Sequence, residues 1–296
     1  MIERKFVDLY ARSAKVPLDI AERDVVLTYV LKILSKDLLA KLVFKGGTCL
    51  KKLFFGNSGR FSMDLDFTSL NISVDELTKE IRKRIDNVEA YGLNFRIKEE
   101  NIREGFDSGD VSYLADVSYT HEWNSSEFMI EVSYREKPIL SPDQNRPLLK
   151  EMYFKYLEFP VFTVNCLQKE ELLAEKIRAA FQRIRSRDLY DMYLFCEKKI
   201  DATKLRKLVV LKFWNVREPF NPNLLFEKLS GTDYNWDDLE QLVRKNNLPS
   251  KETILRKVLA NYSFLKDLDQ DLMRIVKDSK AHKEQDFANR LERTIV

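Results

Sequence analysis

Arg60-Phe-Ser-Met-Asp-Leu-Asp-Phe67 is a stretch in which polar and apolar residues alternate without a break. A period of two is typical of a β-strand with one apolar face and one polar face. On such a strand Asp64 and Asp66 share a face about 7 Å apart, because each residue advances ~3.3 Å. Paired carboxylates, with Ser62 beside them, suit one or two Mg²⁺ ions, which prefer oxygen ligands. A solvent-facing strand edge without function is the alternative.

Lys45-Gly-Gly-Thr48 stands upstream of this strand, at the end of a short apolar run and before a helical pattern over residues 48–55. Paired glycines let the backbone approach a ligand without an intervening Cβ, and the helix behind them offers free N–H groups to a phosphate. Alone, the pattern is more typical of a plain turn. Together with the downstream acids, it favours a phosphate-binding turn.

A third acid is needed to complete a carboxylate site, and the sequence offers two. Glu131 lies between Ile130 and Val132 in a strand pattern, where an unpaired charge is costly. Asp116 lies on the preceding strand of the same predicted hairpin. Spacing leaves the choice open, and either acid can instead pair with a lysine.

The scarce residue types exclude several classes of chemistry. Two histidines and three cysteines lie far apart and match no zinc-binding spacing, and no hydrolase motif surrounds either histidine. The charge balance of 50 − 47 gives only +3, so a nucleic-acid surface has to come from local clustering. No run approaches the roughly 18 apolar residues of a membrane span. We expect a cytoplasmic protein without a membrane partner that uses carboxylates and a metal.

The periodicity changes along the chain. A capped helix is expected over 73–90, beginning after Ser73, and a polar loop over 137–147. Strands are expected at 60–68, 93–99, 111–121, 127–135 and 161–164, and helices follow almost without interruption from residue 168. The sequence therefore predicts an α+β domain over residues 1–165 and an all-α domain over residues 166–296.

Lys169, Lys176 and Arg183 recur every seven residues and share one face of a predicted helix over 168–183. A basic stripe of this kind suits a triphosphate or an RNA backbone. A solvated face with local ion pairs, such as Arg187 with Asp191, is the alternative.

Taken in order, Gly46-Gly-Thr48, the Asp-x-Asp strand and Ile130-Glu-Val132 resemble the pattern of polymerase-β-like nucleotidyltransferases. The continuation Ala174-Glu-Lys-Ile-Arg-Ala-Ala-Phe-Gln-Arg183 into Arg187-Asp-Leu-Tyr-Asp191 resembles the AbiEii/AbiGii toxin family, which includes the MenT toxins. The resemblance covers roughly residues 20 to 200. It implies an N-terminal nucleotidyltransferase domain with a small mixed sheet, followed by a helical domain.

The resemblance also implies a function and a site. The expected function is that of a toxin in a toxin–antitoxin or abortive-infection system, which moves NMP from an NTP to an acceptor, foremost a tRNA 3′ end. Mg²⁺ or Mn²⁺ would be held by Asp64, Asp66 and Glu131, and Lys176 and Asp191 complete the expected catalytic set. The expected nucleotide-binding residues are Gly46, Gly47, Thr48, Arg60, Ser62, Lys176, Arg183 and Asp188.

Two other functions fit the same residues. The protein could be a catalytically idle NTP- or RNA-binding module that acts by sequestration, or an enzyme that AMPylates a protein side chain. The partner implied by the resemblance is a cognate antitoxin, with or without direct contact.

Overall fold

The computed structural model describes residues 1–35, 37–104, 111–157 and 159–295. The chain forms two compact units. Unit 1 comprises residues 1–137, 142–166 and 241–246, and unit 2 comprises residues 138–141, 167–240 and 247–296. Within the described ranges, all strands belong to unit 1, and no helix is long and apolar enough to cross a membrane.

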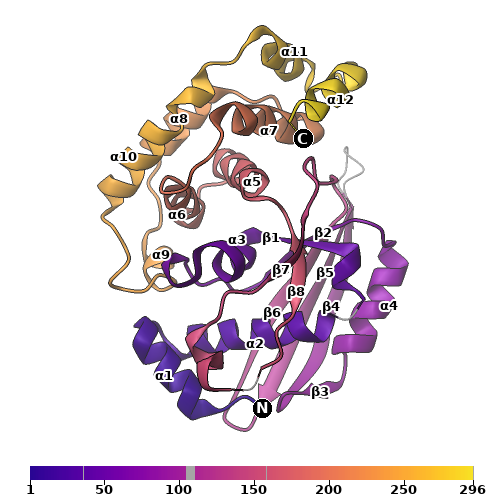
Figure 1. Cartoon of the computed structure of the whole chain (residues 1–296), viewed down its shortest axis with the longest axis vertical. Coiled ribbons are helices and arrows are strands. Elements are labelled where there is room, and N and C mark those ends of the chain that lie inside the picture. Colours follow the sequence, from indigo (N-terminus) through magenta and orange to yellow (C-terminus); the bar gives the residue numbers. More distant parts are fainter. Residues whose placement is uncertain (36, 105–110, 158, 296) are drawn as a thin grey trace. The chain divides into compact units, whose positions relative to one another are not determined.

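Unit 1 is built on a mixed sheet of eight strands in the order β3-β4-β5-β6-β2-β1-β8-β7 (Figure 1). The strands are β1 Leu42–Lys45, β2 Leu65–Ser69, β3 Val88–Ala90, β4 Leu93–Glu104, β5 Val111–His121, β6 Asn124–Ser133, β7 Asp143–Pro147 and β8 Thr163–Cys166. Two pairs, β1 with β8 and β2 with β6, are parallel, whereas the others are antiparallel.

The expectation of a small sheet was wrong. The predicted loop over 137–147 contains β7, which pairs with β8 and extends the sheet on one side. On the other side β3 pairs with β4 immediately after a helix that was expected to run to residue 90. β7 is polar, and β3 has only three residues, so neither forms the longer alternating run by which a half-buried strand is recognised.

The alternation in the acid strand is confirmed, although the strand is shorter than predicted. Leu65 and Phe67 are fully buried on one face of β2, and Asp66 lies half-buried on the other. The strand begins at Leu65 rather than Arg60 because the preceding residues leave the ladder. The Phe61 N–H donates to the carbonyl of Leu242 at 2.7 Å.

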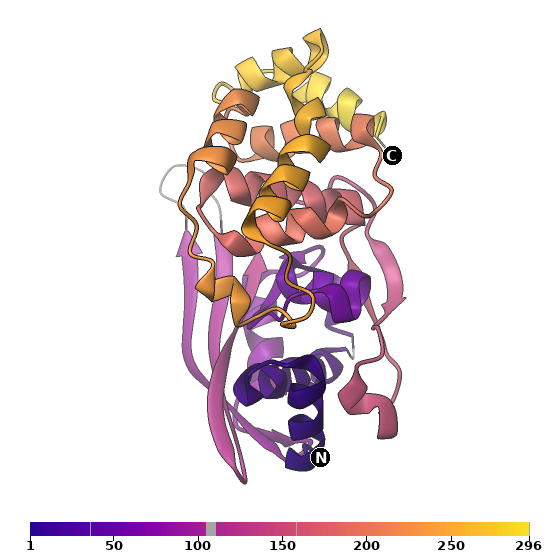
Figure 2. The same cartoon turned by 90° about the vertical axis from the view of Figure 1, so that its left-hand side faces the viewer.

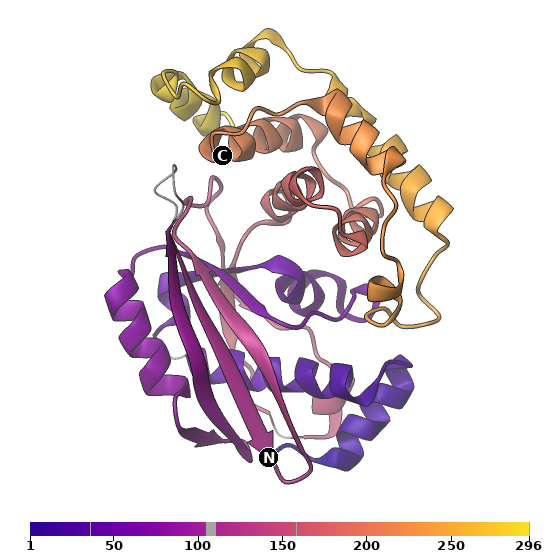
Figure 3. The same ribbon diagram turned by 180° about the vertical axis from the view of Figure 1, so that it is seen from behind.

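The helices of unit 1 are α1 Arg4–Ala14, α2 Leu18–Leu34, α3 Gly46–Cys49 and α4 Val74–Ile85, and α3 continues as a π-helix over Leu50–Phe55. Short 3-10 turns occur at Leu39–Lys41, Gly56–Ser58 and Met152–Tyr156. The predicted cap of α4 is confirmed, since the Ser73 hydroxyl accepts the N–H of Glu76 at 3.2 Å. α4 packs on β4 and β5, and Figure 3 shows it along one face of the sheet.

Unit 2 is a group of helices around a core that α5 and α7 share. Its members are α5 Lys169–Gln182, α6 Ser186–Phe195, α7 Ala202–Asn215, α8 Pro222–Gly231, α9 Asp237–Glu240, α10 Lys251–Asn261, α11 Gln270–Asp278 and α12 Gln285–Arg293, with a 3-10 turn at Ser263–Lys266. α5 packs against α6, α7 and α8, and α10 packs against α6 and α8 (Figure 2). The apolar stripe of α5, including Leu172, Leu173 and Ile177, is buried here.

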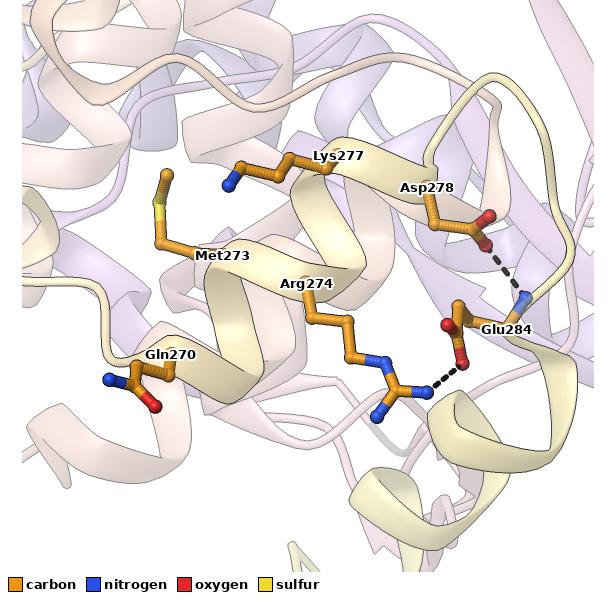
Figure 4. A pocket seen from close by; sticks show the side chains of 6 residues that line it. All are labelled: Gln270, Met273, Arg274, Lys277, Asp278 and Glu284. Carbon is orange, nitrogen blue, oxygen red and sulfur yellow. Dashed lines mark hydrogen bonds and ion pairs between the residues drawn. The ribbon is translucent and has the colours of Figure 1, made fainter.

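Asp278 holds the turn between α11 and α12. Its carboxylate accepts the Trp214 Nε1–H at 3.1 Å and the backbone N–H groups of Lys283 and Glu284, each at 2.9 Å. It lines one end of a surface cleft of about 500 Å³, together with Glu284 and the exposed face of α11 (Figure 4). Burial acts to raise the pKa of Asp278, but these N–H donors outweigh it and lower the pKa.

We expect Asp278→Ala to lower the thermal midpoint of the chain by about 2–4 °C at neutral pH, because three donors lose their acceptor. A group with a depressed pKa contributes stability above its ordinary value of 3.8, and this contribution is lost as the pH falls through the folded-state value. The difference between variant and parent should therefore shrink in acid.

The matched control is Asp271→Ala, which removes an exposed carboxylate from the same helix. Thermal unfolding followed by circular dichroism at several pH values measures both. Equal effects of the two substitutions would contradict the role given to Asp278.

Candidate functional site

Three charged side chains form a row across neighbouring strands of unit 1. Asp66 on β2 is the register partner of Lys45 on β1 and of Glu131 on β6. Register partners on adjacent strands place their side chains on the same face of a sheet. Asp66 and Glu131 are therefore neighbouring carboxylates, with the lysine of the glycine turn on the opposite side of Asp66.

The register distinguishes the two candidates for the third acid. Asp116 on β5 aligns with Met129 on β6, and it is exposed. The whole width of β6 separates it from β2. Glu131 is thus the acid that lies directly beside Asp66, a choice that spacing in the sequence left open.

Asp64 precedes β2 and is tied to two other segments. Its Oδ1 accepts the backbone N–H of Met129 at 3.2 Å, and its carbonyl oxygen accepts the Thr48 hydroxyl at 2.5 Å. The first bond fixes the acid segment, residues 60–66, to β6. The second bond fixes the acid segment to the glycine turn, residues 45–48. Asp64 is therefore held by hydrogen bonds next to the strand, rather than by strand pairing as the alternating pattern suggested.

The glycine turn lies directly against the acid segment. Gly46 has a φ of +76°, and a Cβ at this position would collide with Asp66, 2.7 Å from its carboxyl carbon. A Cβ at Gly47 would come within 2.5 Å of Arg60 Nη2 and 2.9 Å of Ser62 Oγ. The two glycines are needed because side chains of the acid segment occupy the space that their own side chains would take.

Arg60 brings a cation to the same place. The residue is 5% exposed, and its Nη1 donates to the carbonyl of Phe61 at 3.2 Å while Nη2 faces Gly47. A buried guanidinium with a fixed orientation is well suited to phosphate oxygens. Gly46, Gly47, Thr48, Arg60, Ser62, Asp64, Asp66 and Glu131 thus come together in unit 1 as one site.

The carboxylates of Asp66 and Glu131 are donors of the type that a hard divalent cation takes. Mg²⁺ usually takes one or two protein carboxylates and completes its shell with water and substrate phosphates. Asp66 and Glu131 supply such a pair. Among the described residues, no three or more His, Cys, Asp or Glu side chains are grouped so that they could hold a metal ion.

The other predicted residues form a separate ion-pair cluster in unit 2. Lys176 Nζ on α5 lies 2.7 Å from Asp191 Oδ2 and 3.3 Å from Asp188 Oδ1, both on α6. Arg183 donates through Nε and Nη2 to the two oxygens of Asp188, at 2.9 and 3.2 Å. Both aspartates are 1% exposed, so the cations are oriented by buried partners.

The expected basic stripe on α5 is only partly present. Lys169 does not join the cluster, because its ammonium donates to the carbonyl of Lys199 at 2.9 Å and lies 3.6 Å from Glu170. Lys176 is 7% exposed rather than solvated. The seven-residue spacing predicted that the three cations share one face of the helix. Which of them join the ion-pair cluster depends on partners from other segments.

Lys45 was not among the residues predicted for the site. Its place in the row depends on the pairing of β1 with β2, which no local pattern reveals. The only signal in the sequence is its position next to Gly46.

Comparison with known proteins gives one family and a small set of related structures. The family model described as "Nucleotidyl transferase AbiEii toxin, Type IV TA system" matches residues 29–293. The chain is similar to MenT4, a nucleotidyltransferase toxin from Mycobacterium tuberculosis H37Rv, with a TM-score of 0.80, 25% identity, and coverage of 100% of this chain and 99% of that one. It is also similar to JHP933 from Helicobacter pylori, with a TM-score of 0.48, 17% identity, and coverage of 93% and 99%. No curated protein matches the sequence.

The glycine turn provides a test of this geometry. We expect Gly46→Ala to lower the free energy of unfolding by about 1–3 kcal/mol. Alanine is strained at the positive φ of this position, and its methyl group would collide with Asp66. Urea denaturation followed by circular dichroism measures the change.

Gly231→Ala is the matched control, since a Cβ there meets nothing within 4 Å and the residue ends a helix, α8. It should be neutral or slightly stabilising. If both alanines had the same effect, the close approach of Gly46 to Asp66 would be wrong.

Proposed function

The chain belongs to the AbiEii family of nucleotidyl transferase toxins of type IV toxin–antitoxin systems, and from this premise we propose that it moves NMP from an NTP onto an RNA acceptor, foremost a tRNA 3′ end. One observation carries the proposal. The backbone of Gly46 lies against Asp66, whose neighbour in the sheet is Glu131. A phosphate-binding turn and a carboxylate pair therefore share one site.

We assign Asp66 and Glu131 as the pair that would hold Mg²⁺ or Mn²⁺, with Asp64, which the Met129 N–H fixes before β2, as the third acid of the site. A divalent ion bound there supplies positive charge to the phosphates and lowers the pKa of an acceptor hydroxyl. The carboxylate oxygens of Asp66 and Glu131, which are register partners, are of the type that such ions prefer.

The residues of the turn bind and orient the nucleotide. The backbone at Gly46 and Gly47 approaches the phosphates, and Thr48 keeps this backbone fixed through its bond to the Asp64 carbonyl. Arg60 neutralises phosphate oxygens beside the turn, with Ser62 as a further hydrogen-bond donor. Such fixed contacts hold the α-phosphorus for in-line attack without reorganisation.

We assign proton transfer to the carboxylates of Asp66 and Glu131. The acceptor hydroxyl gives its proton to Asp66 or Glu131 as its oxygen bonds to the α-phosphorus, and the bond to the bridging oxygen of pyrophosphate breaks. Both carboxylates lie on the same face of the sheet, so either is placed to accept this proton.

Lys176 is assigned to the triphosphate, with Arg183 beside it. Asp188 and Asp191 hold these cations by short ion pairs, which fix the orientation of both side chains. Asp191 Oδ2 lies 2.7 Å from Lys176 Nζ, and we assign it as the positioning residue of this lysine.

The family also supplies the biological setting of the proposal. We propose that the chain is the toxin of a pair whose antitoxin counteracts it, without need of direct contact between the two proteins. A cytoplasmic location follows from an RNA acceptor and NTP substrates.

The reaction can be tested by incubating the purified protein with Mg²⁺, total tRNA and each NTP labelled at the α-phosphate. We expect label in RNA, and a loss of at least about 100-fold in Asp66→Asn and Glu131→Gln, equal to about 2.7 kcal/mol. Each variant removes a charge that the transition state requires. Asp116→Asn is the matched control and should retain activity, because its carboxylate is exposed and separated from β2.

Three results would contradict the assignment in different ways. Label that persists in Asp66→Ala would remove the catalytic role of that carboxylate. Label in protein rather than RNA would favour AMPylation. Growth arrest that is unchanged in Asp64→Ala and Asp66→Ala, without label transfer, would favour sequestration.

A second prediction concerns the cations of α5. We expect Lys176→Met to raise the KM for the NTP about tenfold, since one contact to phosphate is worth about 1.4 kcal/mol. Lys169→Met removes a lysine seven residues away on the same helix that lies outside the ion-pair cluster, and its KM should stay at the parent value.

Steady-state kinetics at several NTP concentrations measure the difference, with the folded fraction determined by circular dichroism. If the KM changed equally in the two variants, the effect would come from the overall positive charge of the helix rather than from Lys176.

A further inference from the structure

Unit 1 contains a cluster of buried charges that the proposed reaction does not use. Asp24 on α2, Lys51 and Lys52 in the π-helix, and Glu151 form this cluster, and the first three are at most 3% exposed. Lys52 Nζ contacts Asp24 Oδ1 at 3.2 Å, the Asp24 carbonyl at 3.0 Å and Glu151 Oε1 at 2.7 Å. Lys51 Nζ lies 3.7 Å from Asp24 Oδ2.

Burial of four charges is not an efficient source of stability. Desolvation costs several kcal/mol per ion, and apolar replacements of such clusters are often neutral or stabilising. Burial lowers the pKa of Lys51, and it raises the pKa of Glu151 with help from Asp24. For Asp24, burial acts to raise the pKa, but Lys51 and Lys52 outweigh it and lower the pKa. Asp24 is the carboxylate that lies within ion-pair distance of both lysines.

The cluster is joined to both halves of the nucleotide site. Lys51 and Lys52 belong to the helix that starts at Gly46, so their anchoring fixes the segment directly after the glycine turn. The Lys51 ammonium also lies over the ring of Phe61, 4.2 Å from its centroid. Phe61 is the residue after Arg60 in the acid segment. One carboxylate therefore holds two lysines, and through them two segments.

The π-helix gives this arrangement a physical reason. A π-helix is rare, and its wider turn is frequent at functional sites. In this helix two consecutive residues, Lys51 and Lys52, both reach Asp24. The Tyr10 hydroxyl donates to Asp24 Oδ2 at 2.8 Å and completes the surroundings of the carboxylate. Asp24 thus anchors two consecutive residues of the π-helix.

We propose that Asp24 is a positioning residue for nucleotidyl transfer, which holds the Gly46–Thr48 turn and the Arg60–Asp66 segment in the arrangement that binds the nucleotide. The expected change in the KM for the NTP rests on the proposed function. The expected loss of order in the two segments rests only on the contacts of Lys51 and Lys52. Asp24 touches no substrate and acts only through the two lysines.

The same helix offers a matched control. Glu22 lies two residues earlier on α2 and is 1% exposed. Its carboxylate accepts the Tyr119 hydroxyl at 3.0 Å, contacts His121 Nε2 at 3.2 Å and accepts Asn124 Nδ2 at 2.9 Å. All three partners lie at the end of the β5–β6 hairpin. Glu22 and Asp24 are thus equally buried acids that anchor different parts of unit 1.

The test compares Asp24→Asn with Glu22→Gln by two measurements. Hydrogen exchange followed by mass spectrometry, without nucleotide, should show faster exchange over residues 46–55 and 60–66 in Asp24→Asn. In Glu22→Gln the increase should be confined to α2 and the hairpin. In the tRNA labelling assay, Asp24→Asn should raise the KM for the NTP at least about tenfold, because a displaced turn loses phosphate contacts. Glu22→Gln should leave the KM within about twofold of the parent.

The outcomes separate this proposal from the proposed function. Equal exchange over residues 46–55 and 60–66 in the two variants would overturn the positioning role whether or not the protein transfers nucleotides. An unchanged KM in Asp24→Asn would overturn its kinetic consequence. Should the tRNA assay detect no transfer in the parent, the proposed function fails while the exchange result still decides the structural claim.

A milder variant covers the case in which Asp24→Asn does not fold. Glu151→Gln keeps the size of a residue that contacts Lys52 and Thr28 and has a side chain 10% exposed. It should give the same pattern of exchange with a smaller change in KM. Exchange that rises elsewhere but not over residues 46–55 would overturn the proposal.

Discussion

The absence of a side chain at Gly46 is the constraint on which the site depends. β1 ends at Lys45, and the chain then turns with a positive φ so that its backbone lies against the Asp66 carboxylate. Antiparallel pairing brings the end of β1 beside the start of β2, and parallel pairing brings β6 to the other side of β2. The sheet order therefore places the glycine turn, Asp66 and Glu131 side by side.

Charge in this protein is balanced locally rather than spread over separate surfaces. Asp66 has Lys45 as one neighbour in the sheet, and the ion pairs between α5 and α6 match two cations with two aspartates. The formal charge of +3 thus hides pairs of opposite charge at close range. Oriented pairs suit a phosphate substrate, because a cation held by a buried carboxylate needs little reordering when the ligand arrives.

The sequence allowed prediction of those parts that depend on local periodicity. The two faces of β2 around Leu65 and Asp66, and the cap of α4 at Ser73, follow from patterns within a few residues. The size of the sheet, the start of β2 at Leu65, and the place of Lys45 could not be predicted in this way. Each depends on pairing between segments far apart in the chain, such as the bond from Phe61 to Leu242.

The acids of α2 are a case in which the sequence carries a sign of contacts with distant segments. Its residues are buried almost all round, so the helix has little solvent-exposed surface on which a charged side chain could lie. An acid within it must therefore meet a partner from another segment. Residues two apart on a helix do not face each other, so Glu22 and Asp24 have to anchor two different segments. The stretch Ile20-Ala-Glu-Arg-Asp-Val25 could thus have indicated two buried anchors, although only the fold identifies the hairpin and the π-helix as what they hold.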